Sequence, residues 1–325
     1  MLRIILNRLL FLAVAIVVAN FAGFAYAMIA HRVQAAQNPY GSSEEGLPPI
    51  WTEYQSYAAG LWRGDLGTMP VGTGQPLTET LTRAAGASLG LLGLAFGLSL
   101  ALGLVVGVTT VRVETGAIPR WLTPLATIGL AMPSFYIGAL CIMGLVFLAL
   151  RSPTNTAPLP VQGFGWDAHL VLPLLALSVR PTAQIAGLTV SLLVGELSQP
   201  YIIAARSRGN DWRRIRWRHA LRPVLAPIVL AVAASLRLLI GELIVVEWLF
   251  SWPGLGRLMA LALIAPRVAG PGHDDASKFF LLPPLVAALL VIFTVLFVLA
   301  DTLAVLLARA TDPHLRAPVA DSHGR

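Results

Sequence analysis

Six long apolar stretches constrain the fold of this chain more than any other feature. They cover about residues 9–30, 84–111, 122–150, 169–195, 224–249 and 280–308. A helix that crosses the hydrocarbon core of a bilayer needs roughly 20 predominantly apolar residues, each adding about 1.5 Å. All six stretches reach this length, and several exceed it, which indicates tilt or extension beyond the bilayer. The pattern predicts an all-α, polytopic membrane protein with six transmembrane helices.

The composition argues against the alternative, a soluble protein with six buried helices. Of the 325 residues, 56% are hydrophobic and only 12% are charged. The mean hydropathy is +0.74. A soluble domain of this composition would have too little polar surface.

The basic residues are distributed unevenly between the loops, and this imbalance predicts the orientation. With the N-terminus in the cytoplasm, 14 lysine and arginine residues fall on the inner side and seven on the outer side. The remaining two, Arg180 and Arg237, fall inside spans. Because cytoplasmic loops carry an excess of lysine and arginine, we expect both termini in the cytoplasm. The net charge of +7 therefore needs no nucleic acid to explain it.

The N-terminal segment also allows an interpretation as a cleaved export signal. Arg3 and Arg8 precede an apolar run, and Ala25-Tyr26-Ala27 resembles a small-residue cleavage site. The run nevertheless reaches spanning length. We therefore expect residues 1–30 to be retained as the first transmembrane helix. The lone Cys141 lies in a predicted span, so an intrachain disulfide is excluded.

After the first helix, the chain divides into an external loop, a core domain and a tail. The external loop covers 31–78, the core domain with five transmembrane helices covers 79–312, and 313–325 forms a cytoplasmic tail. The long external loop contains aromatic residues, among them Trp51 and Tyr54. Such a loop can fold over the outer mouth or meet an external protein. Aromatic residues are also common at membrane surfaces, which explains them equally well.

Loop 198–223 is a polar segment crowded with seven arginines and set between two apolar stretches. Pro200 suits the first turn of a short helix over 201–208, and Gly209 supplies the left-handed residue that ends it. Asp211 is expected to cap a second helix that ends at about residue 222. The predicted product is a helix-turn-helix at the cytoplasmic membrane surface.

Small and basic side chains in this loop suit contact with a protein. Ala204 and Ala205 permit close backbone approach to a partner. Four arginines can place their forked guanidinium groups on carboxylates: Arg206, Arg208, Arg213 and Arg214. Contact with anionic lipid is the alternative, and charge alone leaves both interpretations open.

The order of residues in the loop adds a more specific signal. The run Ala204-Ala205-Arg206-Ser207-Arg208-Gly209 is followed by Arg218-His219-Ala220-Leu221-Arg222-Pro223 and Pro227. Three further motifs are Gly60-Leu61-Trp62-Arg63-Gly64-Asp65-Leu66-Gly67, Leu130-Ala131-Met132-Pro133-Ser134-Phe135 and Glu247-Trp248-Leu249-Phe250-Ser251-Trp252-Pro253-Gly254-Leu255-Gly256-Arg257. Together they resemble the permease subunits of ATP-binding-cassette importers, in particular the first permease subunit of the dipeptide, oligopeptide and nickel branch. Asp301 and Asp312-Pro313 also fit this pattern.

The resemblance implies a type I importer permease fold and a specific set of partners. A second homologous permease subunit would complete the pathway, two cytoplasmic ATPase subunits would drive it, and an extracytoplasmic substrate-binding protein would deliver cargo. The implied location is the cytoplasmic membrane of a prokaryote. The implied cargo is a di- or oligopeptide, with a nickel chelate or another small solute as the alternative. The implied ATPase-coupling residues are Ala204, Ala205, Arg206, Arg208, Gly209, Arg213 and Arg214.

No catalytic, cofactor-binding or metal-binding residues are predicted in this chain. A phosphate-binding loop of the form GxxxxGK[ST] is absent from the sequence, and the only lysine, Lys278, falls in a predicted external loop. ATP and Mg²⁺ are therefore expected on the partner ATPase subunits. The six histidines are scattered without the paired spacing of metal ligands.

Charged residues within the spans suggest a translocation path. Arg180, Arg237 and Glu242 fall in the fourth and fifth spans, where charge is costly and usually functional or paired. They are candidates for lining the path and contacting a peptide carboxylate or carbonyl. The alternative is pairing within the membrane, for example Arg237 with Glu242. A proton-coupled transporter would also need intramembrane acids, but it would leave the Arg-rich loop unexplained.

Three departures from the family pattern lie outside these motifs. Ser198-Gln199-Pro200 lacks the acidic residue expected just before Tyr201. The segment 265–278 resembles a Gly/Pro-rich insertion, and His31-Arg32-Val33 replaces the usual end of the first helix. Two of these changes lie on the expected outer side, so cargo is less firmly indicated than the type of subunit.

Overall fold

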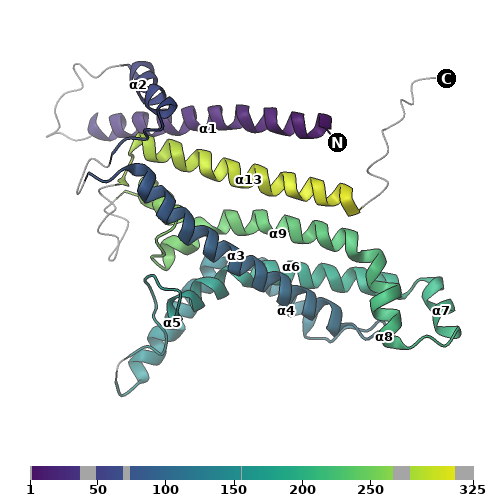
Figure 1. Cartoon of the computed structure of the whole chain (residues 1–325). Helices are drawn as coiled ribbons and strands as arrows, with labels where there is room; N and C mark the ends of the chain where they lie inside the picture. The colour runs from purple at the N-terminus through teal and green to yellow at the C-terminus, as the bar shows by residue number, and fades with distance from the viewer. Residues whose placement is uncertain (1, 37–48, 69–73, 155, 266–278, 312–325) are drawn as a thin grey trace, which may run out of the picture. The chain divides into compact units, whose positions relative to one another are not determined.

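The structure is a computed structural model that describes residues 2–36, 49–68, 74–154, 156–265 and 279–311. These residues form helices and one isolated antiparallel bridge, between Thr68 and Pro76. The helices are α1 (Leu2–Ala36), α2 (Ile50–Trp62), α3 (Leu77–Thr110), α4 (Leu122–Ala131), α5 (Ser134–Arg151), a 3-10 turn (Ala168–Leu170), α6 (Val171–Leu197), α7 (Pro200–Ser207), α8 (Trp212–Arg214), a π-helical turn (Ile215–Ala220), α9 (Leu221–Leu249), α10 (Leu255–Leu263) and α13 (Pro283–Thr311) (Figure 1). All but one residue of the predicted insertion 265–278, and the predicted tail 313–325, lie outside the described residues.

Six helices are long and apolar enough to cross a membrane, which confirms the predicted number. They are Leu6–Gln34, Leu77–Thr110, Ser134–Arg151, Ala168–Leu197, Trp212–Leu249 and Pro283–Leu307. Most of their surface is not buried within the chain, because the windows are only 11% to 44% buried. That exposure suits helices whose apolar side chains face lipid or another membrane subunit.

The third predicted span, 122–150, is not one helix. It is divided into α4, which ends at Ala131, and α5, which begins at Ser134. Met132 is extended with ψ 121°, as the residue before a proline usually is. Pro133 has no N–H to continue the helical ladder, so the chain restarts after it. Of the two parts, only α5 has spanning length.

The described chain divides into two compact units, and the first contains Met1–Leu92, Cys141–Pro173 and Leu243–Val298. Within it, α2 packs on α1 through aromatic rings (Figure 1). Phe24 stacks on Tyr57 with centroids 4.9 Å apart, and the Asn20 amide donates to the Tyr57 hydroxyl at 3.2 Å. The segment 31–78, predicted as a loop, therefore contains a helix held against α1 by ring stacking and a hydrogen bond.

A buried carboxylate organises the turn that follows α9 in this unit. The Glu247 side chain is fully buried and accepts hydrogen bonds from the Ser88 hydroxyl at 2.6 Å and from the Gly256 N–H at 2.7 Å. The chain turns abruptly after α9, with Ser251 at φ 55°. The hydrogen bonds to Glu247 tie the start of α10 to the end of α9, so the role of this acid is structural.

The second unit contains Gly93–Leu140, Leu174–Glu242 and Leu299–Arg325. In it α3 packs closely on α6, because a side chain at Gly103 or Gly107 would come within 2.9 Å of Ile185 or Thr189. Small residues allow this approach between membrane helices. A buried apolar cluster next to this contact holds the polar loop in place; its members are Val108, Val111, Val113, Leu122, Val190, Leu193, Ile202, Ile215, Ala220, Val224 and Ile228.

Candidate coupling loop

The loop 198–223 begins with α7, which forms as predicted. Pro200 is in the first turn, where its missing N–H costs nothing, and the helix ends at Ser207. Ile202 is buried in the apolar cluster and Ala205 is also buried, whereas Ile203, Ala204 and Arg206 are exposed. α7 is thus anchored by one face and presents the other. Figure 1 shows α7 and α8 together beyond the start of α9.

Gly209 ends α7 with φ +80°, the left-handed conformation that its position predicts. The last carbonyl groups of the helix are satisfied locally. The Asn210 side-chain amide donates to the Ala205 carbonyl at 2.8 Å, and Arg208 Nε donates to the Ala204 carbonyl at 3.1 Å. Because these carbonyls are capped, the turn after α7 is a defined structure and not a flexible link.

The second helix of the loop differs from its prediction. Asp211 occupies the N-cap position but its side chain makes no capping hydrogen bond. The helix does not end near Arg222; it runs through a π-helical turn at Ile215–Ala220 directly into α9. Pro223 is therefore inside a continuous helix of 38 residues, Trp212–Leu249.

A hydroxyl group from α7 explains how that helix continues past Pro223. Proline has no N–H for the carbonyl four residues earlier, which belongs to His219. The Tyr201 hydroxyl lies 3.2 Å from this His219 carbonyl and can donate to it. A wider π-helical turn next to the proline also relaxes the usual crowding. Tyr201 thus links α7 to the start of α9.

Tyr201 also contacts an acid that the sequence interpretation missed. Its hydroxyl donates to the Glu196 carboxylate, so its single proton serves either Glu196 or His219. Partial burial, and then the hydrogen bond and negative charge of Glu196, raise the pKa of Tyr201 to about 12. This chain lacks the acidic residue expected just before Tyr201, and Glu196, five residues earlier, supplies one across the turn. The signal that could have predicted this contact is the presence of an acidic residue about one helical turn before Tyr201.

The predicted coupling residues are placed on different surfaces. Ala204 and Ala205 are both predicted to approach a partner, but Ala205 is 1% exposed within the chain's own core, and only Ala204 is available. The Arg206 guanidinium is 4.0 Å from the centre of the Trp212 ring, a cation–π contact that fixes its direction. Arg213 and Arg214 are exposed on α8. The exposed face of the loop is therefore basic and partly pre-oriented.

The in-span charges are paired, although not in the combination given as an example. Arg180 Nη1 donates to Glu242 Oε1 at 2.6 Å, joining α6 to α9. Arg237 Nη1 donates to Asp301 Oδ1 at 2.8 Å, joining α9 to α13. The sequence offered Arg237 with Glu242 as an example of a pair within the membrane. In the structure Glu242 pairs with Arg180. These pairs neutralise charges that would be costly in lipid.

The Arg180–Glu242 pair keeps unused hydrogen-bonding capacity. Arg180 Nε and Glu242 Oε2 are buried atoms without a hydrogen-bond partner among the described residues. The hydroxyl oxygen of Thr182, two residues after Arg180 in the sequence, is also buried and has no such partner. Within the described ranges, no group of three histidine, cysteine or acidic residues gathers to hold a metal ion.

The spans and the exposed helical loop define a class: a multi-pass membrane protein with a structured polar loop between two spans. Residues 93–313, more than half of the chain, match the family described as "binding-protein-dependent transport system inner membrane component", and the chain belongs to this family. It is a permease subunit of the inner membrane of a prokaryote. The resemblance to importer permeases predicted from the motifs is confirmed.

Curated relatives cover most of both chains. The dipeptide transport system permease protein DppB of Lactococcus lactis subsp. cremoris is 26% identical over 82% of this chain and 81% of its own. The oligopeptide transport system permease protein AppB of Bacillus subtilis is 29% identical with the same coverage. The oligopeptide transport system permease protein OppB of Mycobacterium bovis is also 29% identical, again over 82% and 81%.

Proposed function

We propose that this chain forms one half of the translocation pathway of an ATP-driven peptide importer. The second half is a homologous permease subunit, two cytoplasmic ATPase subunits supply the energy, and an extracytoplasmic binding protein delivers cargo. ATP and Mg²⁺ bind the ATPase subunits, and this chain contributes no nucleotide site or cofactor. Both termini and loop 198–223 face the cytoplasm, in keeping with the excess of basic residues there.

The observation that carries the proposal is the way in which α7 is anchored to the rest of the chain. Its inner face is fixed by Ile202 and Ala205, its end is capped, and Tyr201 ties it to α9. A force applied to the exposed face would therefore move the start of α9 instead of bending a loose loop. If closure of the ATPase subunits is to move the pathway, α7 must be attached rigidly to a membrane-crossing helix.

ATP binding drives such a cycle by shifting a two-state equilibrium. ATP binds preferentially to the closed pair of ATPase subunits. Because α7 connects these subunits to the membrane helices, closure of the pair stabilises one arrangement of the helices over the other. The shift can be no larger than the difference in ATP affinity between the two states. Coupling therefore depends on α7 keeping its shape while the ATPase moves.

The Arg180 and Arg237 pairs support a role in the pathway but do not require one. Arg237 and Asp301 side chains are 44% and 35% exposed, so they are available to a cavity or to a partner helix. The Arg180–Glu242 pair retains a buried donor and a buried acceptor. We propose that such partly satisfied pairs contact peptide carbonyl and carboxylate groups transiently, because transport requires weak binding. The cargo class rests on the relatives named above, whose names specify dipeptides and oligopeptides.

The test is peptide uptake by proteoliposomes that contain this chain, a second permease subunit, the ATPase subunits and a binding protein. Labelled dipeptide and hexapeptide should accumulate only with ATP inside, and vanadate should stop the uptake. A nickel chelate offered in the same assay tests the alternative cargo. Uptake that follows a proton gradient without the ATPase subunits would overturn the proposal.

Gly209 provides a local test of the coupling assignment. A valine there must adopt φ +80°, which costs about 1–2 kcal/mol for a residue with a β-carbon, whereas asparagine tolerates this region better. A β-carbon at this position would meet no atom within 4 Å other than those of the adjacent residues, so the effect comes from the backbone and not from a clash. Gly209→Val should reduce ATPase co-purification and uptake together, and Gly209→Asn should retain most of both. Equal activity of the two variants and the wild type would remove α7 from the coupling role.

A further inference from the structure

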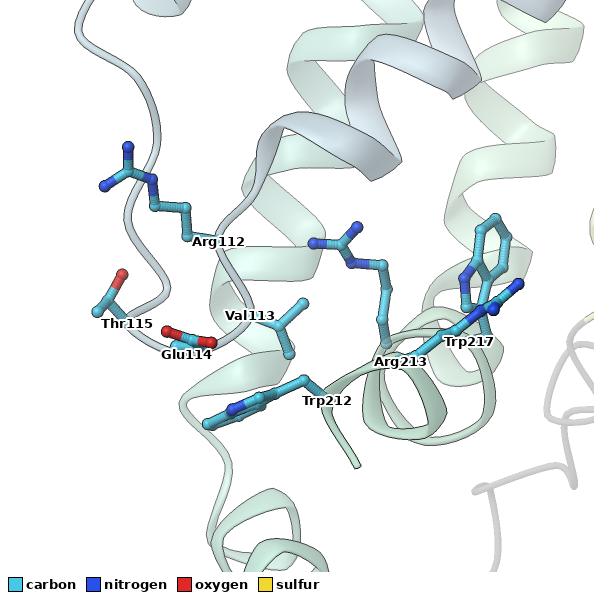
Figure 2. A pocket seen from close by; sticks show the side chains of 8 residues that line it. Arg112, Val113, Glu114, Thr115, Trp212, Arg213 and Trp217 are labelled. Carbon is cyan, nitrogen blue, oxygen red and sulfur yellow. The ribbon is translucent and has the colours of Figure 1, made fainter. Parts of the chain in front are cut away.

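A pocket of about 470 Å³ opens within the second unit, beside the coupling loop. It is lined by Arg112, Val113, Glu114, Thr115, Trp212, Arg213, Arg216 and Trp217. Figure 2 shows the 112–115 turn on one side and the helix that carries Arg213 and Trp217 on the other, with Trp212 below Val113. Ligand pockets commonly have volumes of about 300–1,000 Å³, so this one can hold a small polar group. Of the residues assigned to ATPase coupling, Arg213 lines this pocket.

The lining is strongly basic and selects for an anion. Three of the lining residues are arginines, Arg112, Arg213 and Arg216, and one is acidic, Glu114. Arg112 and Arg213 are exposed, so a ligand can reach them without rearrangement. The planar fork of arginine matches the oxygen atoms of a phosphate group in two-point contacts. Phosphate is therefore the chemistry that this lining fits best.

The frame of the pocket is fixed before any ligand arrives. Arg216 Nη2 donates to the Val111 carbonyl at 2.8 Å, which ties the turn to the π-helical segment. Val111 and Ile215 are 1% and 0% exposed in the apolar cluster beneath. The turn itself is closed by the Gly116 N–H, which donates to the Arg112 carbonyl at 2.8 Å. A pre-organised site loses little entropy when it binds.

The position along the helices places the pocket at the level of lipid headgroups. Arg112 is the first charged residue after the apolar stretch 84–111, and α3 ends at Thr110. Trp217 and Trp121, in the same unit, are 55% and 54% exposed. Exposed tryptophans at the end of a span are typical of the membrane–water interface. An anionic headgroup is thus the phosphate source nearest to the pocket.

We propose that this pocket binds the phosphate group of an anionic phospholipid. Basic pockets between membrane helices are suited to such headgroups. The lipid would bridge the turn after α3 and the helix that leads from the coupling loop into α9. The site does not involve the charged pairs proposed to contact cargo, but it shares Arg213 with the residues assigned to ATPase coupling.

Native mass spectrometry of the full-length chain in detergent tests this proposal, with phosphatidylglycerol as the probe. The pocket variant is Arg112→Gln with Arg213→Gln, and the matched control is Arg120→Gln with Arg218→Gln. Each double variant removes two positive charges from exposed residues, one in the segment after α3 and one in loop 198–223. Arg120 and Arg218, however, do not line the pocket. We expect phosphatidylglycerol affinity to fall about tenfold in the pocket variant and less than about twofold in the control.

Three results would overturn the proposal. An equal loss in both double variants would show that diffuse charge attracts the lipid. Glycerol 3-phosphate that binds as tightly as phosphatidylglycerol would identify a soluble phosphate as the ligand. Unchanged lipid binding with lost ATPase co-purification in the pocket variant would make the pocket a protein interface.

Glu114→Gln keeps the test decisive if the double variants fail to fold. It removes the one opposing charge in the lining, so phosphatidylglycerol should bind about two- to threefold more tightly. A gain in affinity cannot result from misfolding. Unchanged or weaker binding in this variant would contradict a phosphate site.

Discussion

The buried Glu247 offers the sharpest test of how the C-terminal end of α9 is held. Its carboxylate accepts from the Ser88 hydroxyl at 2.6 Å, the Gly256 N–H at 2.7 Å and the Arg257 N–H at 3.2 Å. Ser88 in turn accepts from the Leu255 N–H at 2.7 Å. Glu247 and Ser88 are 0% and 1% exposed, so water cannot replace these bonds. Glu247→Ala therefore leaves three donors without an acceptor.

The size of the loss follows from the number of stranded donors. Each buried donor without a partner costs about 1–3 kcal/mol. Allowing for some relaxation, we expect Glu247→Ala to destabilise the chain by about 3–5 kcal/mol, a large part of the roughly 5–15 kcal/mol that stabilises a typical domain. Glu247→Gln keeps the shape and one acceptor oxygen for the two N–H groups, and its amide can donate to Ser88. We expect that variant to cost about 1 kcal/mol.

Thermal unfolding of the detergent-solubilised chain, followed by tryptophan fluorescence, measures the difference. At about 2 °C for each kcal/mol, Glu247→Ala should lower the midpoint by about 6–10 °C and Glu247→Gln by about 2 °C. Glu79→Ala is the matched control, since Glu79 is a glutamate of the first unit that pairs with Arg83 but is exposed. It should cost less than about 1 kcal/mol.

Two results would refute this reasoning. If Glu247→Ala were as mild as Glu79→Ala, the hydrogen bonds would not hold the turn. If Glu247→Gln were as damaging as Glu247→Ala, then negative charge, and not the pattern of acceptors, would be the feature that counts.

Two other predictions concern pairs in the second unit. Arg180→Met should reduce the free energy of unfolding by about 3 kcal/mol, because it leaves Glu242 unpaired in an apolar setting. In the same thermal assay, adding Glu242→Leu should recover most of this loss. A double variant no more stable than the single variant would argue against the pair. Tyr201 should ionise at about pH 12, followed by phenolate absorbance. Its pKa is raised above the usual 10.0, so its stabilising contribution is complete below pH 10 and is lost as the pH rises towards 12. Glu196→Gln should shift this ionisation towards pH 10, and an unshifted titration would show that Glu196 has no part in it.

Much of the local structure of the coupling loop could be predicted because its signals are local. Pro200 and Gly209 act through their own backbone preferences, and α7 begins and ends where they indicate. Pro133 carried the same kind of signal, yet the apolar run around it favoured one helix. The break at Met132 shows that backbone chemistry prevailed over hydropathy there.

The partners of the charged side chains could not be predicted in the same way. Arg237 pairs with Asp301, 64 residues away, and Ser88 reaches Glu247 across 159 residues. The inward direction of Ala205 and the π-helical turn before α9 also depend on packing with distant segments. None of these contacts leaves a pattern in consecutive residues.

The sequence by itself determined the number of spans, the family and the short helix of loop 198–223. Apolar length and backbone preference are properties of neighbouring residues, and a bilayer imposes the same length on every span. Only the tertiary structure decided which charges pair, which face of α7 is open and where a basic pocket forms beside it. Those features depend on the rotation and register of helices far apart in the chain, which hydropathy does not encode.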